Sequence, residues 1–312
     1  MTPPRDEDHS PAMNAVVATK LSAFKSIYIP YPRHVELHAR LDFLQKLAAC
    51  QRGRPQMGLR VLAPSGSGKT TAARRYQAIV ERKQPAGSPL RPVLYIPLDK
   101  ATTTKRLMVS ILVALGDPQA EKGSEQTLKR RVVAYLERFG VELLIIDEVQ
   151  HLNFRSTAGN DVTDALKTFL DAGVVAIAFL GTKDAEDMFK RNLQLNGRLL
   201  APFDLNPLKM ASVEDRTLLG NFVGSLNEEM ERLGIFPELA DFSSPKILGA
   251  LYDVSHGVVG RISRLFEVAV EIALRRQAKR LEVYDLALAV DRWAIPQAFT
   301  TVNPFRMGGR DD

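Results

Sequence analysis

Cysteine, histidine and long apolar runs are scarce in this sequence of 312 residues. Its single cysteine, Cys50, excludes a disulfide within the chain and fits a reducing compartment, so we expect a cytoplasmic protein. Five histidines without a second thiol argue against a structural zinc site. The longest uninterrupted apolar run, residues 174–180, is far shorter than the roughly 20 residues that cross a membrane. We therefore expect no membrane partner.

Positive charge is concentrated in one segment of the chain. The 42 Lys and Arg residues exceed the 36 Asp and Glu residues, which gives a net charge of +6. Residues 51–106 hold twelve basic and two acidic residues, a net +10, so the remainder of the chain carries −4. A basic segment in a mildly acidic remainder indicates a polyanionic partner such as nucleic acid, although a solvated surface would give the same count.

Short apolar runs alternate with amphipathic segments in the middle of the chain. The runs predict strands at residues 59–63, 93–98, 143–146, 174–180 and 203–205, and the segments between them predict helices near residues 70–82, 103–115, 124–139, 162–171 and 184–195. Nearly continuous apolar strands separated by helices are typical of a parallel sheet covered on both faces. We therefore predict an α/β fold with a parallel sheet sandwiched by helices.

The pattern changes after Pro207, where no further strand is evident. Ser212 begins a capping pattern, and helical segments follow to about residue 233 and near residues 245–253, 258–280 and 283–294. This predicts a separate small all-α domain. The predicted parts are a disordered N-terminus at 1–20, a helical segment packed on the core at 21–50, an α/β nucleotide-binding domain at 51–207, a helical lid domain at 208–294 and a C-terminal tail at 295–312.

One stretch, LRVLAPSGSGKTTAARRY at residues 59–76, has the form of a phosphate-binding loop with one substitution. The pattern G-x-x-x-x-G-K-[ST] fits Lys69 and Thr70, but Ala63 stands where its first glycine belongs. A strand precedes the loop and a helix follows it, and backbone N–H groups at a helix N-terminus bind anions. We predict that the loop binds ATP. The residues assigned to this role are Ser65, Gly66, Ser67, Gly68, Lys69, Thr70 and Thr71.

The residue types in this loop suit that chemistry. Gly66 and Gly68 let the backbone approach the phosphates without a clash from a Cβ atom. The ammonium group of Lys69 can neutralise the β- and γ-phosphates, and the hydroxyl of Thr70 can ligate Mg²⁺. Ala63 is tolerated at the end of the strand if its φ is negative.

A second motif supports the first. The apolar strand LLII at residues 143–146 ends in Asp147 and Glu148. A carboxylate at the C-terminal edge of a strand can complete the Mg²⁺ coordination shell, which is the role of Asp147, and Glu148 can polarise the attacking water. A strand followed by an acidic turn is common by itself. Downstream of a phosphate loop, the pair favours nucleotide hydrolysis over transfer to a small acceptor.

A sensor threonine and an arginine finger are further candidates for catalysis, and Arg261 is a further candidate for nucleotide binding. Thr182 lies at the tip of the strand at 174–180 and is the candidate γ-phosphate sensor, although a plain strand-end threonine fits equally well. Arg198, or alternatively Arg191, is the candidate arginine finger for a neighbouring subunit's phosphate, and the alternative for both is a surface basic residue. Arg261 lies at the predicted N-terminus of a helix, where the helix dipole disfavours a positive charge. A lid arginine over bound nucleotide would explain that position, and so would a solvated helix face.

These motifs together resemble those of a known family. APSGSGKT, LLIIDEVQHL, FLGT, the NGR segment and VVGRISR, in this order, look like an AAA+ ATPase of the initiator-like clade. SIYIPYPRH before the first helix, the DEVQHL form and the NPF tail resemble the TniB/TnsC family of transposition regulators, which are related in role to the Mu B protein. The resemblance covers roughly residues 21–305.

The resemblance implies a mechanism and a set of partners. Family members bind ATP and Mg²⁺ and assemble as a homo-oligomer, a ring or a helical filament, around double-stranded DNA. The filament presents target DNA to a DDE transposase of the TniA/TnsB type and stimulates it, and hydrolysis disassembles the filament and sets target-site choice. A TniQ-like protein is a further implied partner. The residue roles of the family can be carried over to this sequence. ATP-Mg²⁺ is then held by Lys69, Thr70, Asp147 and Glu148. The sensor is Thr182, the arginine finger is Arg198 and the lid arginine is Arg261.

Family DNA contacts lie on pore-facing loops after the second strand, here residues 99–106. The implied DNA-binding residues are Lys100, Thr102, Thr103, Thr104 and Lys105. Small hydroxyl residues between two lysines suit a phosphate track that does not read bases. The threonines suit an N-cap cluster for the following helix equally well. Residues 129–131 are second candidates.

Two other functions share these features. A different AAA+ role, such as a helicase loader, would use the same nucleotide residues, and association with a transposase would separate the two. A nucleotide-gated switch that binds proteins and has no DNA role is the second alternative. Such switches usually carry long repeat sensors after the lid, and only about twenty residues follow it here.

Overall fold

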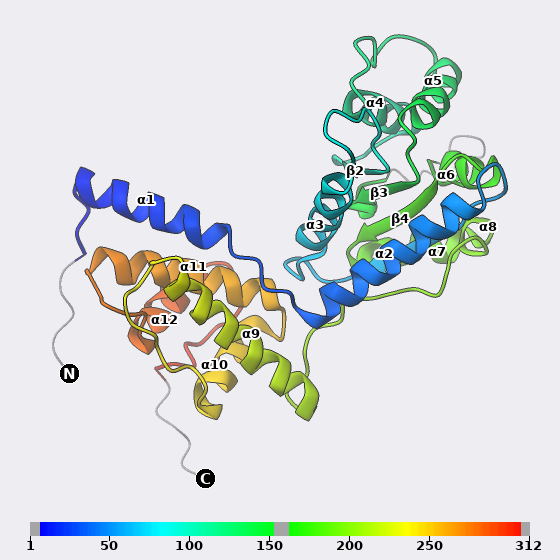
Figure 1. Cartoon of the computed structure of the whole chain (residues 1–312). Helices are drawn as coiled ribbons and strands as arrows, with labels where there is room; N and C mark the ends of the chain where they lie inside the picture. The colour runs from blue at the N-terminus through cyan, green and yellow to red at the C-terminus, as the bar shows by residue number, and fades with distance from the viewer. Residues whose placement is uncertain (1–6, 153–161, 307–312) are drawn as a thin grey trace. The chain divides into compact units, whose positions relative to one another are not determined.

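The computed structural model describes residues 7–152 and 162–306, and the chain divides into two compact units (Figure 1). The first is an α/β unit, Pro32–Asn206, and the second is a helical unit, which combines Met1–Tyr31 with Pro207–Asp312. The boundary near residue 207 was predicted. The segment at 21–50, predicted to pack on the core of the α/β domain, is divided, because the chain passes from the helical unit to the α/β unit at residues 31 and 32.

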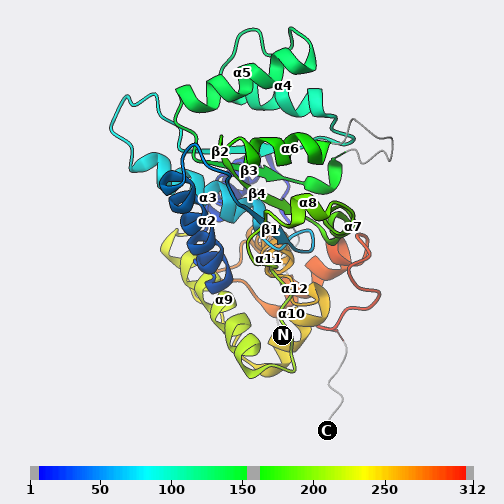
Figure 2. The same cartoon turned by 90° about the vertical axis from the view of Figure 1, so that its right-hand side faces the viewer.

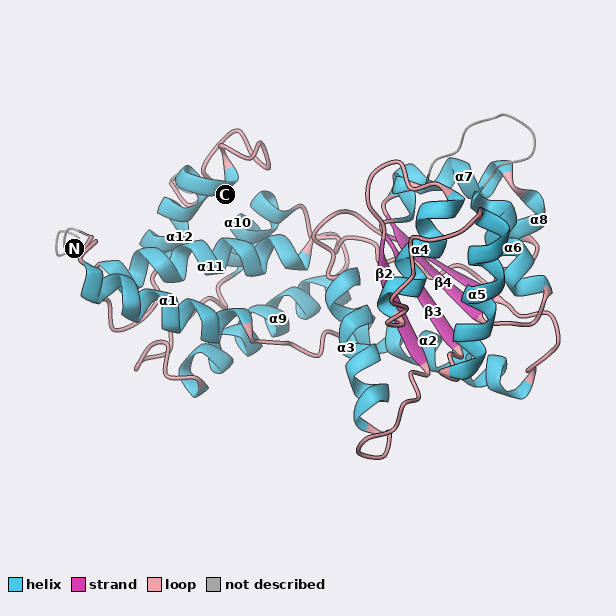
Figure 3. Cartoon of the chain, turned by 90° about the horizontal axis from the view of Figure 1, so that it is seen from above, coloured by secondary structure: helices cyan, strands magenta, loops and turns pink. Residues whose placement is uncertain are grey.

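A parallel sheet forms the centre of the α/β unit. Its strands are β1 (Gly58–Leu62), β2 (Val93–Pro97), β3 (Leu143–Asp147) and β4 (Ala176–Gly181), in the order β1-β4-β3-β2, and all three pairs are parallel. Figure 3 shows β2, β3 and β4 side by side in magenta. The strands are almost entirely buried, which agrees with their continuous apolar sequences.

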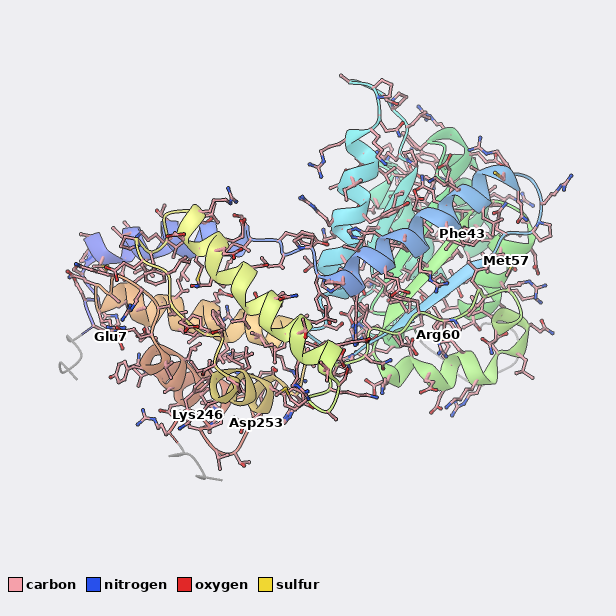
Figure 4. All side chains as sticks on the ribbon, turned by 60° about the horizontal axis from the view of Figure 1, so that its bottom comes forward. Glu7, Phe43, Met57, Arg60, Lys246 and Asp253 are labelled. Atoms are coloured by element: carbon pink, nitrogen blue, oxygen red, sulfur yellow. The ribbon has the colours of Figure 1, made fainter. Side chains whose placement is uncertain are left out.

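The predicted fifth strand is present only as an irregular edge segment. The N–H groups of Leu200, Phe203 and Leu205 donate to carbonyls of β1, so residues 199–205 run along the free edge of that strand. A side-chain contact reinforces this edge, because Arg60 of β1 (labelled in Figure 4) donates to Asp204 over 3.4 Å. The three donors are three and then two residues apart, whereas their acceptors in β1 are evenly two residues apart, so the pairing is irregular and no regular strand forms there.

Helices cover both faces of this sheet. On one face, α2 (Pro32–Cys50) and α3 (Lys69–Arg82) pack against alternate strand residues. On the other face lie α4 (Thr104–Ala114), α5 (Glu125–Arg138) and α6 (Val162–Asp171), and Figure 2 shows α4 and α5 side by side. Because successive residues of a strand point to opposite faces, each strand contributes to both hydrophobic clusters.

The helix predicted near residues 184–195 is broken in two. It forms α7 (Glu186–Arg191) and α8 (Leu193–Asn196), and Asn192 lies between them. The Asn192 side chain accepts a hydrogen bond of 2.9 Å from the N–H of Leu195, so it caps a new helix instead of continuing the first. This break places Arg191 at the end of one helix and Arg198 just beyond the other.

The helical unit is built around one central helix, α11 (Val259–Arg275), whose apolar face is buried. Around it pack α9 (Val213–Arg232), α10 (Pro245–Ser255) and α12 (Val283–Ala289), which continues into a π-helical turn, η3 (Val290–Ala294). The predicted helix at 258–280 was too long. It ends at Arg275 because Gln277 adopts a left-handed conformation with φ of 57°.

The predicted disorder of residues 1–20 is wrong from Pro11 onward. Helix α1 (Pro11–Lys25) begins there, with Ser10 accepting from the N–H of Met13 as its N-cap. Val17 and Phe24, seven residues apart, are buried in the helical unit, and α1 lies beside α11 (Figure 1). The predicted disordered segment and tail also include residues 1–6 and 307–312, which lie outside the described residues. No described helix is long and apolar enough to span a bilayer.

Candidate nucleotide-binding site

The loop between β1 and α3 has the backbone geometry of an anion cradle. Gly66 and Gly68 have φ of 82° and 85°, a region in which residues with a Cβ atom are strained. Gly68 is the N-cap of α3, and among the described residues no side chain caps this helix end. The first N–H groups of α3 therefore stay available to a ligand, and the helix dipole favours a negative charge there.

Ala63, which stands where the usual loop pattern has a glycine, directly follows β1 and is hydrogen-bonded to the end of β4. Its φ is not positive, its side chain is 1% exposed, and its N–H donates to the carbonyl of Gly181 over 3.0 Å. A methyl group at this position packs in the hydrophobic cluster under α2 and α3. The backbone conformation at this position therefore does not require a glycine.

Lys69, the first residue of α3, is buried beneath the loop. Its Nζ donates to the carbonyls of Ala63 over 3.0 Å and Pro64 over 3.2 Å. Burial lowers the pKa of Lys69, and the negative charges of Asp147 and Glu148 oppose that effect. The ammonium group is therefore held close to the loop by weak neutral acceptors that a phosphate oxygen could replace.

Asp147, at the end of β3, joins three elements of the site. It is fully buried, and its Oδ2 accepts from the Thr70 hydroxyl over 2.5 Å and from the Tyr95 hydroxyl over 2.6 Å. Its Oδ1 accepts from the N–H of Glu148 over 2.8 Å. Thr70 and Asp147 are 77 positions apart in the sequence, and both had been predicted as Mg²⁺ ligands. The structure brings their oxygens together.

The sequence reasoning missed Tyr95, although a tyrosine inside a buried strand needs a partner for its hydroxyl. That hydroxyl orients Asp147 from the neighbouring strand, β2. Burial and the adjacent Asp147 carboxylate raise the pKa of Tyr95, so it stays a neutral donor at physiological pH.

Glu148 and Thr182 are also brought together, through a third residue. The side-chain amide of Gln150 donates to the carboxylate of Glu148, and its carbonyl oxygen accepts from the N–H of Thr182 over 3.1 Å. The Thr182 hydroxyl donates to Asp184 over 2.9 Å. The predicted base and the predicted sensor thus share one bridge between the ends of β3 and β4.

His34 of α2 supports the phosphate loop from behind and was not predicted. Its Nε2 lies 2.9 Å from the carbonyl oxygen of Ser67. Burial lowers the pKa of His34, so the ring is neutral and Nε2–H is the donor. A Cβ atom on Gly68 would lie 2.5 Å from the ring, so the loop and the histidine fit only with glycine there.

The polar groups of this site fit a nucleoside triphosphate with Mg²⁺. The hydroxyl of Ser67 is buried in the loop and has no hydrogen-bond partner among the described residues. Two glycines of positive φ give the loop a backbone conformation that residues with a Cβ atom rarely adopt, and Thr70 and Asp147 supply the oxygen ligands that Mg²⁺ prefers. Among the described residues, no group of three or more His, Cys, Asp or Glu side chains is arranged to hold a metal ion.

The two candidate finger arginines differ in how they are held. Arg198 pairs with both carboxylate oxygens of Asp171 and donates to the carbonyl of Gln194 over 2.7 Å. Arg191 is exposed at the end of α7, and no ion pair is formed by it within the described part of the chain. Arg198 is therefore anchored within its own α/β unit, whereas Arg191 is accessible to a second molecule.

The predicted DNA-binding threonines mostly face inward. The side chain of Thr102 is 1% exposed and its hydroxyl donates to the carbonyl of Asp99 over 2.6 Å, and Thr104 is 6% exposed. Thr103 is the N-cap of α4, which agrees with the alternative interpretation of the threonines as a helix-capping cluster. Burial thus removes Thr102 and Thr104 from the candidate DNA contacts.

Lys100 and Lys105, in contrast, are exposed and form no ion pair with any described residue. Among the second candidates, Arg131 is committed to Asp117 and to the loop carbonyls of Gln119 and Lys122. Arg106 is exposed as well, but it pairs with Asp99 at 3.7 Å. Among the described basic side chains of residues 99–106, the two lysines are therefore the exposed ones without an ion pair.

Arg261 lies in the first turn of α11, as predicted. Its guanidinium stacks over the ring of Phe299 at 4.7 Å, and Nη1 lies 3.4 Å from the carbonyl oxygen of Ser255. Burial lowers the pKa of Arg261. The stacking explains why a cation is tolerated at a helix N-terminus, where the dipole disfavours it.

Comparison with known proteins gives a family and a fold. The family model described as bacterial TniB protein matches residues 23–210. The Aeropyrum pernix ORC2 protein, solved as ADPNP-ADP complexes, is similar with a TM-score of 0.60 at 17% identity, over 86% of this chain and 71% of that chain. Cdc6p from Pyrobaculum aerophilum is similar with a TM-score of 0.60 at 17% identity, over 87% of this chain and 70% of that chain.

A third similar structure is the Aeropyrum pernix ORC1 protein in complex with DNA, with a TM-score of 0.55 at 20% identity, over 81% of this chain and 64% of that chain. At these identities the likeness concerns the fold, which is that of the AAA+ ATPases. No curated protein matches the chain.

Proposed function

Because the chain belongs to the bacterial TniB family, we propose that it is an ATP-dependent regulator of DNA transposition. In this proposal it assembles as an oligomer on duplex target DNA, recruits and stimulates a DDE transposase, and uses ATP hydrolysis for disassembly and target-site selection. One observation carries the ATPase part of the proposal. Lys69 and the Thr70–Asp147 pair converge on a loop whose two glycines have positive φ.

The residues of the loop bind and orient the triphosphate. The N–H of Ser67 is bonded to the carbonyl of Pro64, so the phosphates are bound by the remaining N–H groups of the loop and of the first turn of α3. Lys69 exchanges its carbonyl partners for a phosphate oxygen. Bound Mg²⁺ neutralises charge on the β- and γ-phosphates. Thr70 and Asp147 hold it, and Tyr95 keeps Asp147 oriented by donating to its Oδ2.

Hydrolysis needs a base and a positive charge from outside the loop. Glu148 accepts the proton of the attacking water, and Thr182, which lies at the end of β4, contacts the γ-phosphate side of the site. Arg191 is a better arginine finger than Arg198, because a guanidinium that acts on a neighbouring subunit must be exposed and unpaired. In the helical unit, Arg261 is the lid arginine.

DNA contact is assigned to the loop that precedes α4. Lys100 in this loop and Lys105 in the first turn of α4 are exposed without ion-pair partners among the described residues, and Thr102 fixes the loop backbone by donating to the carbonyl of Asp99. Two exposed lysines on a braced loop can follow a phosphate backbone without reading bases. The solved structure of the Aeropyrum pernix ORC1 protein with DNA supports a DNA role for this fold. A TniA/TnsB-like transposase and a TniQ-like protein are the proposed partners.

The proposal is tested by loading on DNA and by transposase stimulation. Glu148→Gln keeps the shape of the side chain but removes the base, so ATP binding should persist while turnover falls at least about 100-fold. DNA complexes formed with ATP should therefore live correspondingly longer than those of the unmodified protein. Unchanged turnover would show that Glu148 is not the base. An equal DNA affinity with and without ATP would contradict the proposed cycle.

A further inference from the structure

The side chain of Gln150 makes two contacts with opposite chemistry. Its NH₂ group donates to Oε2 of Glu148, and its carbonyl oxygen accepts from the N–H of Thr182 over 3.1 Å. A flipped amide would place oxygen against carboxylate and NH₂ against N–H, so only one orientation satisfies both partners. The amide is therefore fixed by a backbone group of the neighbouring strand end.

The backbone around Gln150 is held just as firmly. Gln150 lies in the middle of the 3-10 helix η1 (Val149–His151), which follows directly on Glu148. Val149 is fully buried beside β4, and the carbonyl of His151 accepts from the N–H of Thr102 over 2.9 Å. The position of the Gln150 side chain is thus set by the sheet and by the loop before α4.

Gly181 leaves the space that this bridge requires. A Cβ atom at position 181 would lie 2.9 Å from Oε1 of Gln150 and 2.7 Å from Cγ2 of Val149. The glycine therefore allows the amide to reach the end of β4. A side chain there would displace Gln150 from the N–H of Thr182.

We propose that Gln150 is the positioning residue for Glu148, an inference that rests on the proposed ATPase function. Glu148 itself has φ of 60°, and among the described residues Gln150 is the one side chain that donates to its carboxylate. By occupying Oε2, the amide fixes the carboxylate plane and leaves the other oxygen for the attacking water. Without the amide, the free side chain would sample several rotamers, and few of them would present an oxygen to that water.

The test compares two substitutions at position 150. Gln150→Met keeps the volume and removes both contacts, and Gln150→Glu keeps an oxygen for the N–H of Thr182 but removes the donor to Glu148. The matched control is Gln77→Met, which removes an amide–carboxylate bond of 2.8 Å to Glu81 on α3. Three quantities are measured: kcat for ATP, the equilibrium affinity for ATP, and hydrogen exchange of the Thr182 amide without nucleotide.

Gln150→Met should lower kcat at least tenfold, keep the ATP affinity within about twofold, and speed exchange at Thr182. Gln150→Glu should lower kcat to a similar extent but keep the Thr182 amide protected. Gln77→Met should change none of the three. An unchanged kcat in Gln150→Met would overturn the inference, because the amide would then have no effect on catalysis. A raised kcat would overturn it as well, because the amide would then hold Glu148 in a less active position.

Lys69→Ala separates this inference from the proposed function. Loss of ATP binding in Lys69→Ala together with normal turnover in Gln150→Met would overturn only the role of Gln150. Normal ATP binding in Lys69→Ala would overturn the nucleotide site itself, and the role of Gln150 with it.

Discussion

Gly68 is a residue at which the backbone and the neighbouring side chain impose the same requirement. Its φ of 85° is strained for any residue with a Cβ atom, and that atom would also meet the ring of His34 at 2.5 Å. His34 in turn holds the Ser67 carbonyl, and the N–H of the same peptide group points the opposite way, away from the histidine. The imidazole thus aims the Gly68 N–H at the phosphate side of the loop.

We predict different effects on ATP affinity for two substitutions at this loop that each add or remove one methyl group. Gly68→Ala should weaken ATP binding at least tenfold, because strain and the clash with His34 distort the cradle. Ala63→Gly, which restores the usual pattern, should leave ATP affinity within about twofold, because Ala63 already has a negative φ. Titration with a fluorescent ATP analogue measures both. A Gly68→Ala protein that binds as tightly as Ala63→Gly would show that the loop has another conformation.

At the scale of elements, the sheet and the two motifs were predictable because their signals are local. A strand that ends in Asp-Glu and a strand that ends in a Gly-rich loop must bring their C-terminal ends to one edge of a parallel sheet, and the Thr70–Asp147 contact confirms this. Helix α1 was missed because its two buried residues need α11 as a partner.

The direction of side chains in the loop before α4 could not be read from the sequence. Three consecutive threonines look alike in a sequence, yet only Thr103 is exposed. The hydroxyl of Thr102 is satisfied by the carbonyl of Asp99, a local bond that depends on the backbone turn at Ala101, whose φ is 55°. The bridge formed by Gln150 escaped notice for the same reason, since it depends on the spacing between two strand ends.

Helix α2 should make the stability of the protein fall in mild acid. Burial lowers the pKa of both His34 and His38 in the folded state from about 6.5. Below about pH 6.5 the unfolded chain therefore binds more protons than the folded one, so the stability present above that pH is lost as the pH falls towards the lowered pKa values.

Thermal unfolding at pH 7.5 and pH 5.5 checks this prediction. His34→Gln with His38→Gln keeps an amide donor for the carbonyls of Ser67 and Ala72 and removes the titrating rings. The double variant should lose less Tm between the two pH values than the unmodified protein. An equal loss in both proteins would place the acid sensitivity elsewhere.

At the scale of the whole molecule, charge is divided unevenly along the chain. Residues 51–106 carry +10, and this stretch contains both the phosphate loop and the loop before α4. Several of its cations are already engaged: Lys69 lies under the loop, Arg74 stacks on the ring of Tyr95 at 4.4 Å, and Arg91 donates to the carbonyl of Ala114. Lys100 and Lys105 are among the exposed cations of this stretch that form no ion pair with a described residue.

Reversing the charge of these two lysines should weaken DNA binding and spare ATP turnover without DNA. The log of the DNA affinity of the unmodified protein should fall steeply with the log of salt, and Lys100→Glu with Lys105→Glu should make that slope shallower by about 2. The matched control is Lys46→Glu with Lys190→Glu, which changes the net charge equally at two exposed lysines paired with Asp42 and Glu186. An equal loss of DNA affinity in both proteins would indicate that the net charge of the protein, and not this loop, determines DNA binding.

The most direct test of the nucleotide site is an equilibrium titration of the purified protein with ATP and Mg²⁺. Lys69→Ala removes the cation under the loop and should weaken binding at least about 50-fold, the scale of one charge-assisted hydrogen bond in a partly dry site. Lys83→Ala, an exposed lysine at the other end of α3, should bind like the unmodified protein. Equal ATP affinity in Lys69→Ala and Lys83→Ala would contradict the assignment of the loop, and with it the proposed ATPase.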